Sequence, residues 1–123
     1  MRLHLLITLF ALLALPRLAA AQATPQSKLA WDQDAADLAT ANSFTYRHFD
    51  DGSATGTPLT PVTCTGTASP FTCRVPFPSF TPGVQHAIAV SAANQAGESL
   101  PSTPLSFQFI VIPNSPRNLR AEP

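Results

Sequence analysis

The sequence predicts an all-β protein built as a sandwich of two sheets. Residues 85–93 alternate between two faces, with Ile88 and Val90 on the apolar face, and this period of two is typical of a strand that buries one side. The 13 prolines leave little room for helices, because proline breaks the interior of a helix. Charged residues make up only 11% of the chain, as is common in secreted β modules.

Residues 1–23 have the parts of a secretory signal peptide. A short basic start precedes an uncharged apolar run from 5 to 15, and the small residues that follow predict cleavage after Ala21 or Ala23. A retained membrane anchor is the weaker alternative, because the apolar run is too short to span a bilayer comfortably. We therefore expect a secreted or periplasmic protein with no membrane span after cleavage.

Removal of this segment leaves about 100 residues, enough for one domain. Without Arg2 and Arg17 the chain has five basic and seven acidic residues, which gives a net charge of −2. Such a charge is neither the footprint of a nucleic-acid-binding protein nor a polybasic membrane patch. A nucleic-acid partner is therefore not expected.

Further strands are predicted from the same alternation. They cover residues 28–32, 43–50 and 105–112, and segment 33–42 is expected to be a loop. Trp31 is the largest apolar side chain and should bury most of its ring between the sheets, although a surface aromatic in a binding patch is the alternative. The inward faces of these strands and of the alternating strand give the predicted core: Leu29, Trp31, Phe44, Tyr46, Ile88, Val90, Phe107 and Phe109.

The only two cysteines, Cys64 and Cys73, flank a turn between two short strands. An even pair of cysteines in an exported protein predicts a disulfide, which would contribute about 2–3 kcal/mol by constraining the unfolded chain. Their spacing is not that of a redox-active Cys-x-x-Cys motif, and two cysteines alone make a poor metal site.

The end of the alternating strand carries the pattern Val-x-Ala-x-Asn-x-x-Gly-x-Ser from Val90 to Ser99, and Phe80 and Pro82 precede it. On these residues the chain resembles the fibronectin type III family over about residues 27–112. His86 stands where that family usually has its corner tyrosine. The resemblance implies an immunoglobulin-like sandwich and a role that is mostly non-catalytic.

The resemblance also implies a first strand, which in this chain is absent or truncated. Residues 113–123 instead resemble the first strand of a following module. They are either a linker from a tandem array, which is the favoured interpretation, or a strand that adds to another copy of the chain. The second interpretation predicts a strand-exchanged homo-oligomer in which the tail covers the open edge beside Leu29 and Trp31.

No catalytic set is evident, and neither an enzyme nor a cofactor is expected. His48 and His86 have no neighbours at metal-ligand spacing, and the chain has no nucleophile-elbow pattern. The cluster of Asp32, Asp34 and Asp37 raises the hypothesis of a calcium site. Its spacing matches no EF-hand loop, so a solvated acidic loop is favoured.

These features predict a non-catalytic module for protein–protein interaction or spacing, whose partner is an extracellular or periplasmic protein or glycan. In the family, two of the loops share one end of the sandwich. The contact residues predicted on them are Asp34, Asp37, Gln95 and Glu98. The alternative is a carbohydrate-binding accessory module of an extracellular enzyme system, for which Tyr46 and Phe49 are the aromatic candidates.

Overall fold

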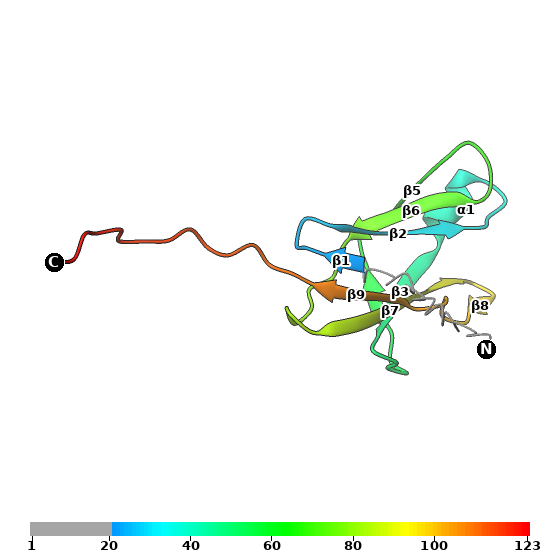
Figure 1. The fold of residues 1–123 in the computed structure, drawn as a ribbon. Coiled ribbons are helices and arrows are strands. Elements are labelled where there is room, and N and C mark those ends of the chain that lie inside the picture. Colours follow the sequence, from blue (N-terminus) through cyan, green and yellow to red (C-terminus); the bar gives the residue numbers. More distant parts are fainter. Residues whose placement is uncertain (1–20) are drawn as a thin grey trace, which may run out of the picture.

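The computed structural model describes residues 21–123 and shows two β-sheets that form a sandwich (Figure 1). This confirms the predicted all-β architecture. The larger sheet has the strand order β1-β9-β7-β3-β4, with β8 also paired to β7, and the smaller sheet has the order β2-β6-β5. The elements are β1 (Ala21–Ala23), β2 (Lys28–Gln33), α1 (Leu38–Ser43), β3 (Thr45–Asp50), β4 (Thr57–Leu59), β5 (Thr63–Thr65), β6 (Phe71–Pro76), β7 (Gln85–Asn94), β8 (Gly97–Glu98) and β9 (Leu105–Phe109).

Within the described residues the first strand, β1, comprises three residues. β1 runs parallel to β9, with Ala23 opposite Phe109, and the amide of Ile110 donates to the Ala23 carbonyl at 2.8 Å. Ala23 is 2% exposed. The two predicted cleavage positions, after Ala21 and after Ala23, therefore fall within or at the end of β1, while residues 1–20 of the predicted signal peptide lie outside the described residues.

β7 is the central strand of the larger sheet, and side chains on both of its faces are buried. It pairs antiparallel with β3 on one side and β9 on the other. Ile88 is buried on the inward face as expected, but Ala89 and Ser91 on the opposite face are only 7% and 2% exposed. The alternation predicted one solvated face. The structure differs because Glu98 binds the Ser91 hydroxyl and segment 99–104 returns beside β7.

Segment 33–42, predicted as a loop, runs into helix α1. Asp37 is the N-cap residue, and its side chain accepts a hydrogen bond from the Thr40 amide at 2.7 Å. This hydrogen bond lowers the pKa of Asp37. Only Ala41 is buried among the six helical residues, so the segment has no apolar stripe of helical period that would have revealed the helix in the sequence.

The core lies between the sheets around Tyr46 and Trp31. Their rings meet edge to face with centroids 5.1 Å apart, and the Tyr46 hydroxyl donates to the Ala41 carbonyl at 2.8 Å. Burial raises the pKa of Tyr46. The predicted core residues divide into two groups, the fully buried Leu29, Tyr46, Ile88, Phe107 and Phe109 and the half-buried Trp31, Phe44 and Val90, which pack against them.

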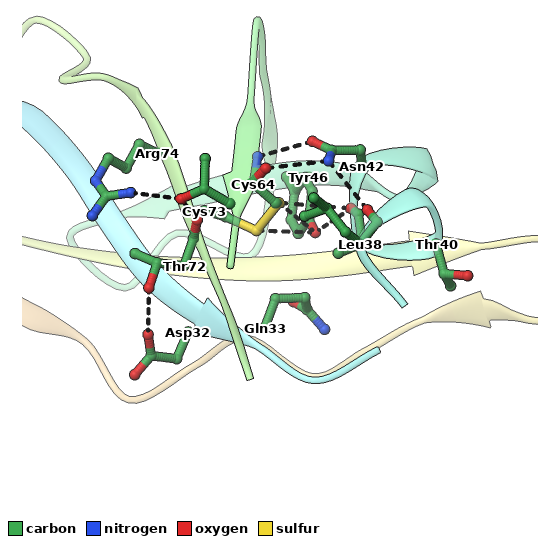
Figure 2. The surroundings of a disulfide bond; sticks show 12 residues. Asp32, Gln33, Leu38, Thr40, Asn42, Tyr46, Cys64, Thr72, Cys73 and Arg74 are labelled. Atoms are coloured by element: carbon green, nitrogen blue, oxygen red, sulfur yellow. Dashed lines mark hydrogen bonds between the residues drawn. A yellow bond between two sulfur atoms is a disulfide. The ribbon is translucent and has the colours of Figure 1, made fainter. Parts of the chain in front are cut away.

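β5 and β6 form a hairpin that carries the disulfide. Cys64 lies opposite Cys73 in the strand register and their sulfurs are bonded, which is the pairing expected from the sequence (Figure 2). Asn42 fastens this hairpin to α1, because its side chain accepts from the Cys64 amide at 2.8 Å and donates to the Cys64 carbonyl at 3.2 Å. Cys64 therefore links the two strands of the hairpin through the disulfide and also carries the hydrogen bonds to α1.

β9 ends at Phe109, whereas the sequence predicted a strand as far as residue 112. Val111 and Ile112 are 52% and 72% exposed and lie outside the ladder. Pro113, which has no backbone N–H to donate, follows directly. Residues 113–123 then project away from the domain (Figure 1).

Chains that begin at Gln22 and at Thr24 should differ in stability. Starting at Thr24 removes the buried Ala23 and its hydrogen bond with Ile110, so we expect the free energy of unfolding to fall by about 1–3 kcal/mol. Urea unfolding of the two purified chains measures this difference. Equal stabilities would show that β1 adds nothing to the sheet.

Candidate functional site

A hollow at one end of the sandwich brings together two of the loops predicted to bind a partner. It has a volume of about 390 Å³ and lies between the end of β2, the residue before β3 and the β7–β8 hairpin. Asp34 and Glu98 line it together with Gln33, Asn94 and the half-buried ring of Phe44. We call this feature the acidic hollow, because both of its charged side chains are carboxylates.

Glu98 is held from two sides. The Ser91 hydroxyl donates to its Oε1 at 2.5 Å, and Nη1 of Arg47 lies 3.5 Å from its Oε2. Ser91 is 2% exposed, so a donor within the sheet fixes the orientation of this carboxylate. The ion pair with Arg47 is exposed and screened by salt, and it balances the charge of Glu98 only in part.

Asp34 keeps one carboxylate oxygen available. Its Oδ1 accepts from the Ser69 hydroxyl at 3.2 Å, and within the described residues its Oδ2 has no hydrogen-bond partner. Asn94 accepts from the Ala96 amide through Oδ1, which leaves its side-chain NH₂ group as a donor. The hollow therefore offers a free acceptor, a free donor and an aromatic surface within one concavity.

Asp37 and Gln95, the other two predicted contact residues, do not line the hollow. The carboxylate of Asp37 is engaged at the start of α1, and Gln95 is exposed in the turn between β7 and β8. The structure thus brings Asp34 and Glu98 together and leaves Asp37 and Gln95 outside.

The three aspartates of the predicted acidic loop do not converge on one point. The carboxylates of Asp32, Asp34 and Asp37 accept hydrogen bonds from three different partners, and the bond from the Thr72 hydroxyl to Asp32 is drawn in Figure 2. In the part of the chain from residue 21 onward, no group of three or more His, Cys, Asp or Glu side chains is placed to hold a metal ion. The geometry favours a solvated acidic loop.

Both histidines in the described part of the chain contact carboxylates. His48 Nδ1 lies 2.6 Å from Asp50 Oδ1, and His86 Nδ1 lies 2.9 Å from Asp51 Oδ2. Nε2 of His86 also lies 3.0 Å from the Thr81 carbonyl oxygen. Across residues 21–123, no serine, threonine or cysteine side chain is hydrogen-bonded to either ring, so neither histidine is positioned to activate such a nucleophile.

Because both ring nitrogens of His86 face acceptors, its protonated form is favoured. The hydrogen bonds to Asp51 and to the Thr81 carbonyl raise the pKa of His86. The same contact with His86, aided by a hydrogen bond from the Ala87 amide, lowers the pKa of Asp51. The pair joins the turn after β3 to the start of β7, which is a structural role.

Phe44 and Asn94 line the hollow although the sequence assigned them other roles. Phe44 was placed in the core, and it does lie edge to face against Tyr46 with centroids 6.4 Å apart, but another part of its surface borders the hollow. Its position as the first apolar residue of the alternating segment was the available signal, because the end of a sandwich is less covered than its middle. Asn94, the asparagine of the pattern from Val90 to Ser99 on which the family resemblance rests, ends β7.

Comparison of the chain with protein-family models, with curated proteins and with solved structures finds no match. Over residues 21–123, no helix has the length and apolar character needed to cross a membrane. The acidic hollow and the arrangement of the strands are therefore the features from which a function can be inferred.

Replacing His86 by phenylalanine should lower stability more at about pH 5 than at about pH 9. The pKa of His86 is raised above 6.5, so its contribution is complete below that value and is lost as the pH rises through the raised pKa. The pKa of Asp51 is lowered below 3.8, so its contribution is present above that value and is lost as the pH falls through the lowered pKa. Urea unfolding of both chains over this pH range measures the effect.

Asp51→Asn is the matched control, because it keeps the shape of the side chain and removes its charge. It should abolish the same pH-dependent part of the stability. Phenylalanine keeps a ring in contact with Phe80, whose centroid lies 4.9 Å from that of His86, so packing is largely preserved in the first variant. A stability loss that did not vary with pH would contradict the role of the pair.

Proposed function

We propose that this protein is a non-catalytic, exported module resembling a fibronectin type III domain, and that it binds another protein through the acidic hollow. The observation that carries the proposal is the convergence of Asp34 and Glu98, from separate loops, beside the accessible part of the Phe44 ring. Since no hydroxyl or thiol side chain of the described residues is hydrogen-bonded to His48 or His86, a binding role suits the geometry better than catalysis does.

The arrangement of strands supports the resemblance to that family. The order β4-β3-β7-β9 in one sheet and the pairing of β2 with β6 in the other are those of immunoglobulin-like sandwiches. His86, at the position of the family's corner tyrosine, has its Nε2 within hydrogen-bond distance of the Thr81 carbonyl. The disulfide between Cys64 and Cys73 fits an oxidising compartment outside the cytoplasm.

The chemistry of the acidic hollow favours a cationic side chain from the partner. The free Oδ2 of Asp34 is an acceptor for a guanidinium or ammonium group, and the Phe44 ring adds a surface over which such a cation is attracted. Arginine suits this combination best, because its planar group both stacks on rings and donates several hydrogen bonds. We therefore expect a partner with an exposed arginine-containing segment.

A carbohydrate-binding role has weaker support. Tyr46 is 3% exposed, so it has no open face on which a sugar ring could stack. Phe49 is half-buried, and its ring lies so close to Gly56 that an added Cβ would come within 2.8 Å of it. The proposal for a protein partner is therefore preferred.

The test is recovery of a binding partner from the native envelope or extracellular fraction, with the full chain as bait. Asp34→Asn removes one negative charge from the hollow and keeps the size of the side chain. We expect it to reduce recovery by about tenfold, as loss of an interface anchor does. Quantitative mass spectrometry of the captured proteins measures the change.

Glu122→Gln is the matched control, since it removes one negative charge from the exposed tail, at the other end of the molecule (Figure 1). It should recover the partner as the unaltered chain does. Equal losses in both variants, or no loss in either, would show that the acidic hollow is not the contact surface.

A further inference from the structure

β2 has a free edge. Within the described residues it pairs only with β6. The Phe77 amide donates to the Ser27 carbonyl, so hydrogen bonds between β2 and β6 form at every second residue counted from Ser27. Because these residues alternate along an antiparallel pair, the backbone groups of Lys28, Ala30 and Asp32 point away from β6. A strand edge of this kind is a template for another extended segment.

A groove runs beside this edge. It has a volume of about 210 Å³ and lies between β2 and the segment around Leu100, with Trp31 and Val90 among its lining residues. Leu100 is 89% exposed. The Trp31 Nε1 atom is buried and, among the residues described, has no hydrogen-bond partner, which costs free energy. The groove thus combines uncovered apolar surface with the unpaired backbone groups of the β2 edge.

The C-terminal tail has the features of an occupant. Residues 113–123 project away from the domain as an irregular chain, and Leu119 is 99% exposed (Figure 1). Arg117 and Arg120 flank this leucine, whereas the end of β2 and the residue after it supply the carboxylates of Asp32 and Asp34. Of these two carboxylates only Asp32 lines the groove, and an arginine of the tail is complementary to it in charge.

We propose that residues 117–121 of one chain add as a strand to the free edge of β2 in a second copy of the chain. Leu119 then covers Trp31 and Leu100, and Arg120, which lies on the opposite face of the added strand, approaches Asp32 on the outward face of β2. Asn118 has a φ of 53° in the free tail and takes up an extended backbone on pairing. This contact rests on the proposed interaction function and names a second copy as one partner.

A crosslinking experiment with the full chain tests where the tail binds. A photoreactive phenylalanine at position 119 is introduced into unlabelled chain, which is then mixed with isotope-labelled chain that lacks the probe. We expect crosslinks from the unlabelled tail to labelled peptides that contain residues 28–33. Crosslinks confined to one chain, or directed to β4 or β5, would overturn the proposal.

Two variants test the energetics by sedimentation over a range of concentrations. Leu119→Asp should weaken self-association by about tenfold, as loss of an apolar anchor does, and it leaves the folded domain untouched because Leu119 contacts none of it. Ser115→Asp, which adds the same charge outside the paired segment, should not weaken it. Equal behaviour of the two variants, or a chain that is monomeric even at millimolar concentration, would overturn the proposal.

These results separate the strand addition from the proposed function. If the chain is monomeric but still captures a partner that depends on Asp34, only the strand addition fails. If the chain self-associates through Leu119 but no captured partner depends on Asp34, the acidic hollow is not a protein-binding surface and the tail contact stands.

Discussion

The contact between Trp31 and Tyr46 joins the two sheets, and the remaining structure is arranged around it. The Tyr46 hydroxyl donates to the Ala41 carbonyl and lies 3.6–3.7 Å from the sulfurs of Cys73 and Cys64. One side chain of the larger sheet thus touches β2, the helix and the disulfide hairpin of the smaller sheet. A domain of this size buries little apolar area, so a side chain that fills the centre and satisfies its own hydroxyl has a large effect on stability.

The strands whose alternation continues over many residues were predictable, and the parts fixed by long-range contacts were not. β7 was evident because its apolar residues recur at every second position, but burial of Ser91 depends on Glu98, which returns from the next turn. Helix α1 was not predicted, because it buries a single alanine and so has no apolar stripe of helical period. Of the acidic hollow, Asp34 and Glu98 were predicted from the shared end of two loops, whereas the part played by Phe44 depends on how much of its ring the sandwich leaves uncovered.

The domain and its tail differ in their balance of acidic and basic residues. Lys28, Arg47 and Arg74 are the basic residues of the body after residue 23, against six acidic ones, while residues 113–123 contain Arg117 and Arg120 against a single glutamate. Within the body, Arg47 forms an ion pair with Glu98, and Arg74 donates a hydrogen bond to the Thr65 hydroxyl. The end of the sandwich that carries the acidic hollow is therefore negatively charged, and the tail, which has more basic than acidic side chains, leaves from the opposite end (Figure 1).

The edges of the two sheets differ in how they resist pairing with other chains. β4 carries Pro58, β5 is three residues long, and β1 covers part of β9. β2 is six residues long and lacks proline, but it bears Lys28 and Asp32 on its outward-facing backbone positions. Charged residues on an edge oppose pairing with an apolar strand, because their desolvation is not compensated. They oppose it less where the incoming strand brings an opposite charge, as an arginine of residues 117–121 does beside Asp32.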